Sequence, residues 1–181
     1  MTIPFVLCVL MSTVLAAQNT FTLYAYGTNI SGSQVFYSQG IAQIGDVRYA
    51  NSSNVSNVYF YEESGKFIAN PNITSTTASL KASESNTTWT DLSFYIPKSS
   101  GQPLGFTTNI NSAEVTTGSW HFYGEYAFIE NSAGQLESHF FAQPTDVDGV
   151  YNILWSLSDQ AQLASPEIKS ISIRTIPPAS G

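Results

Sequence analysis

The sequence predicts an all-β fold, a single-domain antiparallel sandwich or barrel. Short segments rich in aromatic and β-branched residues alternate with turns made of glycine, proline, asparagine and serine. Ten tyrosines and eleven phenylalanines supply large flat side chains for a core. Only residues 158–165, SDQAQLAS, have a composition that favours a helical turn.

Turn residues bound the predicted strands. Gly27 ends the first strand, Gly65 offers the positive φ that a hairpin within residues 56–71 needs, and Pro97 closes a later strand. Residues 131–134, NSAG, predict a turn between two aromatic-rich segments. In chain order, the strand-forming segments cover residues 21–27, 33–46, 56–71, 90–97, 102–110, 118–130, 135–144, 149–158 and 168–176.

The dipeptide Phe-Tyr occurs four times, beginning at Phe36, Phe60, Phe94 and Phe122. The intervals of 24, 34 and 28 residues do not support a strict repeat. A degenerate three-fold barrel of the β-trefoil kind is one alternative. Neighbouring aromatic residues on opposite faces of strands explain the pattern more simply.

Residues 1–17 predict a signal peptide, with cleavage after Ala16 or Ala17. The apolar run that begins at Ile3 is shorter than the roughly 20 residues of a spanning helix. The alternative for this run is a buried first strand. We therefore expect residues 18–181 to form one β-rich extracellular domain without a transmembrane segment.

Five Asn-x-Ser/Thr sequons agree with export, at Asn29, Asn51, Asn54, Asn72 and Asn86. Four of them lie in tracts rich in Ser, Thr and Asn, which indicate exposed loops. The only cysteine, Cys8, lies in the predicted signal peptide, so the mature domain has no disulfide and no thiol nucleophile. The formal charge of −7 argues against binding to nucleic acid or anionic membranes.

Residues 118–149 contain both histidines of the chain. If Ile129 lies opposite Leu136 in a hairpin, His121 and His139 point to opposite faces and cannot share a metal ion. A slip of one residue would change this result. We therefore expect no metal site and no cofactor.

Two glutamates in the same stretch, Glu125 and Glu137, are candidates for the acid and base of a glycosidase. The same hairpin register turns them to opposite faces. If the protein is an enzyme, the candidate catalytic residues are His121, His139, Glu125 and Glu137. No Gly-x-Ser-x-Gly, dinucleotide-binding or phosphate-binding motif occurs, and the segment PTDVDG predicts an Asx turn more simply than a calcium loop.

Trp89 and Trp120 are the candidate ligand-binding residues, because an exposed indole ring can stack on a sugar of a polysaccharide. The alternative is that both are core residues. A pocket lined by Phe and Tyr inside a barrel could instead hold a small apolar metabolite, and could act as a cyclase or isomerase.

The pattern LYAYGTNISGSQVFYSQGIAQIGD, followed by LGFTT and DGVYNILW, resembles a group of small secreted proteins of filamentous fungi. The resemblance implies a fungal, extracellular, β-rich protein, and it assigns no activity or catalytic residue. We expect a secreted glycoprotein, free or bound to the cell wall, with a structural or binding role. The alternative is a secreted enzyme that acts on a glycan or a small apolar metabolite.

Overall fold

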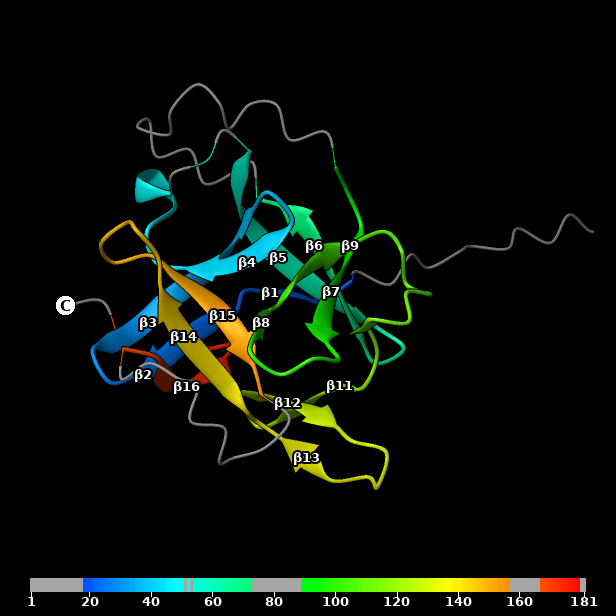
Figure 1. Ribbon diagram of the computed structural model, residues 1–181. Helices are drawn as coiled ribbons and strands as arrows, with labels where there is room; N and C mark the ends of the chain where they lie inside the picture. Colours follow the sequence, from blue (N-terminus) through cyan, green and yellow to red (C-terminus); the bar gives the residue numbers. More distant parts are fainter. Residues whose placement is uncertain (1–17, 51, 53, 73–88, 157–166, 180–181) are drawn as a thin grey trace, which may run out of the picture.

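A computed structural model describes residues 18–50, 52, 54–72, 89–156 and 167–179 (Figure 1). The predicted signal peptide and the predicted helical turn at 158–165 lie outside these residues. Within them the only helical element is the short 3₁₀ turn η1 (Val47–Tyr49). The prediction of an all-β antiparallel fold is confirmed, and the strands form a closed barrel.

The strands follow the turn signals of the sequence but are more numerous than the predicted segments. They are β1 (Thr20–Phe21), β2 (Tyr24–Gly27), β3 (Ile30–Ser38), β4 (Ile41–Ile44), β5 (Val55–Glu63), β6 (Lys66–Pro71), β7 (Leu92–Pro97), β8 (Gln102–Pro103), β9 (Gly105–Thr107), β10 (Val115–Thr116), β11 (Trp120–Tyr123), β12 (Tyr126–Glu130), β13 (Leu136–Glu137), β14 (Phe140–Pro144), β15 (Tyr151–Trp155) and β16 (Lys169–Arg174).

Two circuits of hydrogen-bonded strands share the β3–β4 hairpin. One circuit runs β3–β5–β6–β7–β9–β4, and the other runs β3–β2–β16–β14–β15–β4. The circuits diverge because β3 pairs with β2 along its first part and with β5 along its second. Strand β4 likewise pairs with β9 at Ile41 and with β15 at Ile44. Closure of this kind pairs the strands of both circuits on each side, whereas β11, outside the circuits, pairs among the described strands only with β12.

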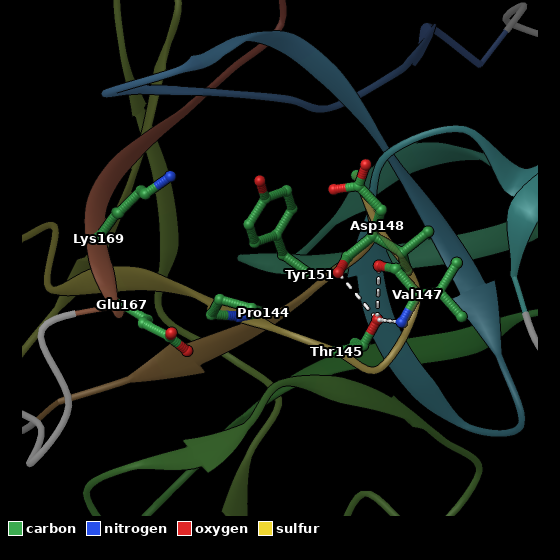
Figure 2. Close-up of a pocket in the computed structure, with 9 residues that line it drawn as sticks. Pro144, Thr145, Val147, Asp148, Tyr151, Glu167 and Lys169 are labelled. Carbon is green, nitrogen blue, oxygen red and sulfur yellow. Dashed lines mark hydrogen bonds between the residues drawn. The ribbon is translucent and has the colours of Figure 1, made fainter.

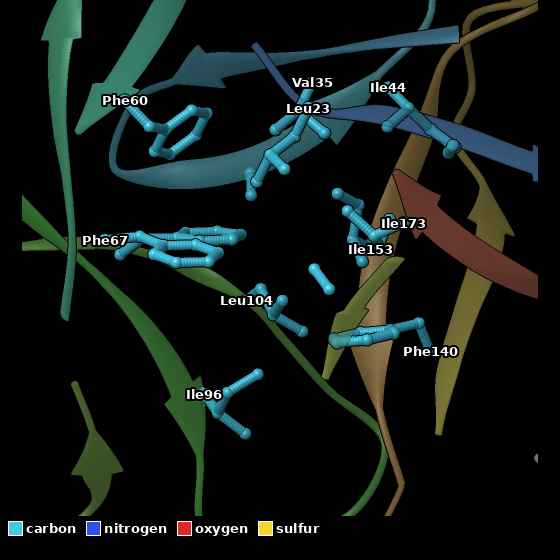
Figure 3. Packing of buried hydrophobic residues seen from close by; sticks show 14 of the residues in the cluster. Leu23, Val35, Ile44, Phe60, Phe67, Ile96, Leu104, Phe140, Ile153 and Ile173 are labelled. Carbon is cyan, nitrogen blue, oxygen red and sulfur yellow. The ribbon is translucent and has the colours of Figure 1, made fainter. Parts of the chain in front are cut away.

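One core cluster fills the barrel, and Figure 3 shows part of it. Aromatic rings occupy its centre around Trp120, which is 1% exposed. The indole ring stacks on Phe67 and Phe94, with ring centroids 4.8 Å apart in each case. The ring of Phe140 lies 6.1 Å away and nearly parallel to it. The indole Nε1 donates a hydrogen bond of 3.1 Å to the carbonyl oxygen of Phe94, so the polar atom of this buried side chain is satisfied.

The end of β4 approaches the β14–β15 turn closely enough to require glycine. Gly45 has a φ of +132°, and a Cβ built there would lie 2.3 Å from the carbonyl oxygen of Gly149. Next to it, Asp46 caps η1 by accepting a hydrogen bond from the backbone N–H of Arg48. The same carboxylate binds the Arg48 guanidinium, which holds the pKa of Asp46 below its usual value.

The segment 118–130, expected as one strand, is a hairpin of β11 and β12. Gly124, with a φ of +58°, opens its two-residue turn. Because of this turn, even-numbered residues of β11 and odd-numbered residues of β12 lie on the same face of the hairpin. Ala127 and Ile129 therefore face the core together with Trp120. The expected pairing of Ile129 with Leu136 is wrong by one residue, because Ile129 lies opposite Glu137.

Candidate functional site

The two histidines contact different acids. His121 lies on the outer face of β11, and its Nε2 is 2.7 Å from Oε2 of Glu130. His139 is mostly buried, with its ring 5.6 Å from Trp155 and its Nδ1 3.9 Å from Oε2 of Glu137. In the described part of the chain, no group of three His, Cys, Asp or Glu residues could hold a metal ion.

The two candidate glutamates lie at opposite ends of β12. Glu125 is in the turn before this strand, and Glu137 pairs with Ile129 near its far end. At about 3.3 Å per residue, the four residues from Glu125 to Ile129 span roughly 13 Å. The two carboxylates of a glycosidase are roughly 5 to 9.5 Å apart. The backbone positions of these glutamates therefore do not favour such a pair.

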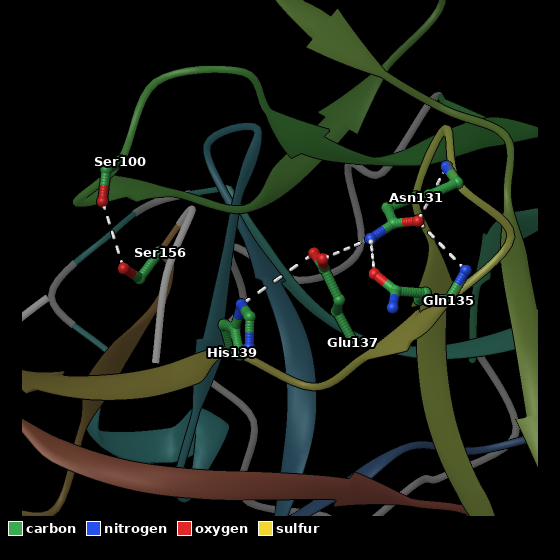
Figure 4. A network of polar contacts seen from close by, with 7 residues as sticks. Ser100, Asn131, Gln135, Glu137, His139 and Ser156 are labelled. Carbon is green, nitrogen blue, oxygen red and sulfur yellow. Dashed lines mark hydrogen bonds and ion pairs between the residues drawn. The ribbon is translucent and has the colours of Figure 1, made fainter. Parts of the chain in front are cut away.

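Glu137 belongs to a polar network that closes a turn (Figure 4). Asn131 donates from Nδ2 to Oε1 of Glu137 at 2.6 Å, and its Oδ1 accepts the backbone N–H of Gln135 at 3.0 Å. The backbone N–H of Ser156 donates to the carbonyl oxygen of His139 at 3.1 Å. These contacts fix the β12–β13 turn and the start of the β14–β15 ladder, which is a structural role.

Two open clefts are lined entirely by residues that the structure describes, and none of the four candidate catalytic residues lines either of them. The first, of about 280 Å³, lies between the β14–β15 turn and the start of β16 (Figure 2). The ammonium group of Lys169 lies 5.7 Å from the Tyr151 ring there. The second, of about 550 Å³, is lined by Tyr95, and burial raises the pKa of the Tyr95 phenol. Each cleft has acidic and basic side chains in its lining, so neither shows a clear charge preference.

The two tryptophans singled out in the sequence pack against core residues. Trp120 is enclosed at the barrel centre, and the half-buried Trp89 lies against Tyr37 with ring centroids 4.5 Å apart. Neither ring is thus presented as an open platform for a sugar.

A row of exposed aromatic side chains lies on the outer face instead. Cross-strand pairing aligns Tyr123 with Tyr126, Tyr126 with Arg174, and Arg174 with Tyr24. These four side chains, here called the tyrosine row, come from the adjacent strands β11, β12, β16 and β2. Their neighbours Ala25, Ala127 and Ile173 are at most 2% exposed and face the core, so the row points outward.

Two of the four side chains in the row are exposed, and Tyr24 and Arg174 are half-buried. Tyr123 is 74% exposed and Tyr126 is 37% exposed. Since neighbouring strands are about 4.8 Å apart, the three intervals of the row span about 14 Å. Ile176, which is 40% exposed, lies two residues after the end of β16.

Arg174 holds the rings of this surface in place. Its guanidinium carbon lies 4.4 Å from the ring centre of Tyr126 and 4.7 Å from that of Tyr26, which neighbours the row on β2. Its Nε donates to the hydroxyl of Ser172 at 3.1 Å, and the Tyr26 hydroxyl donates to the carbonyl oxygen of Ile176 at 2.8 Å. Aromatic rings fixed in this way lose little conformational entropy when a ligand binds.

Local sequence patterns do not indicate this surface. Its members lie near residues 24, 125 and 174, and only the pairing of distant strands brings them together. The one local feature that could have pointed to it is Gly124, which sets the pairing of Tyr123 with Tyr126.

Three of the five sequons lie in the described residues. Asn29 is exposed in the β2–β3 turn, Asn54 is exposed just before β5, and Asn72 is half-buried after β6. Asn51 and Asn86 lie outside the described residues. The structure therefore leaves at least Asn29 and Asn54 accessible to a glycan.

Comparisons with family models, with curated proteins and with solved structures find no match to this chain. Among the described residues, no helix has the length and apolar character needed to cross a membrane.

Proposed function

We propose that this protein is a secreted, N-glycosylated glycan-binding protein that acts without catalysis, in the extracellular space or at the cell wall. The tyrosine row is the observation that carries the proposal. A pyranose ring has an apolar C–H face that packs on an aromatic ring, while the tyrosine hydroxyl remains free for hydrogen bonds. Tyrosine supplies this contact area at a low entropic cost.

Two further observations support a binding role over an enzymatic one. His121 contacts Glu130 and His139 contacts Glu137, so the two histidines are paired with different acids. None of these groups lines either of the two clefts. Export itself is supported by the signal-like residues 1–17, by the sequons and by the resemblance to secreted fungal proteins.

The proposal is tested by retention of the purified protein on insoluble chitin, β-glucan, cellulose and xylan. We expect one or more polymers to retain it, and we expect Tyr123→Ala to weaken binding about three- to tenfold, the typical contribution of one aromatic contact. The matched control is Tyr49→Ala, because Tyr49 is 62% exposed on η1, outside the row.

Thermal unfolding of each variant separates lost binding from lost folding. Exposed tyrosines contribute little to stability, so Tyr123→Ala and Tyr49→Ala should both unfold near the wild-type temperature. Equal retention of the Tyr123→Ala/Tyr126→Ala double variant and the wild type would refute the role of the row. If neither these neutral polymers nor an acidic one retains the protein, the glycan-binding proposal is wrong.

A further inference from the structure

Arg174 is a cation without an acidic partner among the described residues of an acidic protein. The chain has thirteen Asp and Glu residues against six Lys and Arg. Even so, no carboxylate oxygen of the described residues lies within 4.0 Å of the Arg174 guanidinium, although Arg48 has such a contact with Asp46. The positive charge at the centre of the tyrosine row is therefore available to a ligand.

The contacts of Arg174 determine which of its groups a ligand can reach. Tyr26 and Tyr126 lie against the guanidinium at 4.7 and 4.4 Å, and Ser172 accepts from Nε. The two terminal nitrogens, Nη1 and Nη2, carry in-plane N–H donors that match the two oxygens of a carboxylate. An arginine held in a fixed position offers this fork at a small entropic cost.

We infer that the tyrosine row prefers a carboxylated polysaccharide, a polymer of uronic acid residues, to a neutral glycan; this rests on the proposed function. A uronic acid carries its carboxylate at the edge of the sugar ring. Arg174 lies one strand spacing, about 4.8 Å, from Tyr126. The guanidinium covers one face of the Tyr126 ring, so we expect the sugar to stack on the more exposed Tyr123 beside it, with the polymer continuing over Tyr126 and a carboxylate beside the guanidinium.

The acids nearest in the sequence oppose this preference only in part. Glu130 lies about 13 Å along β12 from Tyr126 and contacts His121, and this distance exceeds the Debye length of about 8 Å at physiological salt. Glu125 lies in the turn beside Tyr126 and would repel a bound carboxylate. Glu125→Gln should therefore strengthen binding to an acidic polymer.

The experiment compares polygalacturonate with its methyl ester, which has the same sugar backbone without the charge. Binding is measured by titration calorimetry with the full mature protein. We expect the acid form to bind at least about tenfold more tightly at low salt, because a hydrogen bond between charged groups is considerably stronger than one between neutral groups. Raising the sodium chloride concentration from 50 to 500 mM should reduce this difference.

The matched variants are Arg174→Gln and Lys98→Gln, which each remove one positive charge. Lys98 is exposed next to β7, outside the row. Arg174→Gln should remove the preference for the acid form, whereas Lys98→Gln should retain it. Arg174→Lys keeps the charge but loses the planar fork, so we expect intermediate binding. Thermal unfolding shows whether each variant is folded.

Each outcome separates this inference from the proposed function. Equal binding of the acid and the ester by the wild type would overturn the preference and leave the glycan-binding proposal standing. Equal loss of acid binding in Arg174→Gln and Lys98→Gln would show a diffuse charge effect and would also overturn it. If neither these two polymers nor a neutral one binds, both proposals fail. The comparison of the two polymers needs no variant, so it remains decisive even if Arg174→Gln does not fold.

Discussion

Trp120→Ala should be among the most destabilising single substitutions in this barrel. The indole ring is 1% exposed and stacks on Phe67 and Phe94, and its Nε1 donates to the Phe94 carbonyl oxygen. Truncation to alanine removes these contacts and leaves a cavity at the centre of the core.

The loss in the free energy of unfolding can be worked out in two ways. A buried aromatic side chain removes about 150–250 Å² from water, and at about 25 cal/mol per Å² this corresponds to about 4–6 kcal/mol before the residual alanine is subtracted. Substitutions of this type in other cores cost about 3–5 kcal/mol. We therefore expect a loss of about 4 kcal/mol, a large part of the typical 5–15 kcal/mol for a folded domain.

The assay is urea unfolding followed by far-UV circular dichroism, with Trp120→Phe and Tyr49→Ala as companions. Trp120→Phe keeps most of the stacking but loses the hydrogen bond, so it should cost about 1–3 kcal/mol. Tyr49→Ala, at an exposed position, should change stability by less than about 0.5 kcal/mol. A loss below about 1 kcal/mol for Trp120→Ala would mean that the indole ring is not the centre of the core.

Two further substitutions test local features of the fold. Gly45→Ala should destabilise the barrel by about 1–3 kcal/mol, since its Cβ would meet the carbonyl oxygen of Gly149. Gly118 has open space around it, so the control Gly118→Ala should change stability by less than about 1 kcal/mol. Differential scanning calorimetry of both variants measures these changes. Asp46→Asn keeps a cap on η1 but removes the ion pair with Arg48. Because that pair lowers the pKa of Asp46, its contribution to stability is present above the unfolded pKa of about 3.9 and is lost as the pH falls through the lower folded pKa. The stability difference between wild type and Asp46→Asn should therefore shrink below about pH 4, and a difference independent of pH would refute this assignment.

Most of the fold could be predicted from local patterns. The segments 21–27, 90–97 and 168–176 contain β2, β7 and β16, because period-two alternation and terminal turn residues are properties of neighbouring residues. The hairpin at Gly124 could not be predicted from such patterns, because a local period of two does not show where a strand turns. In WHFYGEYAFIE, the aromatic residues at positions 120, 122, 126 and 128 keep a period of two across the turn, so the segment has the pattern of one strand.

The candidate site was much less predictable than the fold. The sequence favours tryptophan as the platform for a sugar, but the large indole ring also fills a core well, and Trp120 has that role. The tyrosine row depends on the order of strands in the sheet. No local pattern specifies that Tyr24, Tyr126 and Arg174 are neighbours, because only the pairing of β2, β16 and β12 makes them so.

The position of β16 in the sheet also determines when its circuit of strands can close during synthesis of the chain. This late strand does not cap an edge but lies between β2, near the start of the barrel, and β14. Arg174 pairs with Tyr24, which lies 150 residues earlier in the chain. Closing a loop of this length costs about 4 kcal/mol of conformational entropy. A ribosome that has made only the first fifteen strands therefore carries a chain in which the circuit β3–β2–β16–β14–β15–β4 cannot close. Until residue 174 emerges, such a nascent chain exposes unpaired edges of β2 and β14, and edges of this kind favour aggregation.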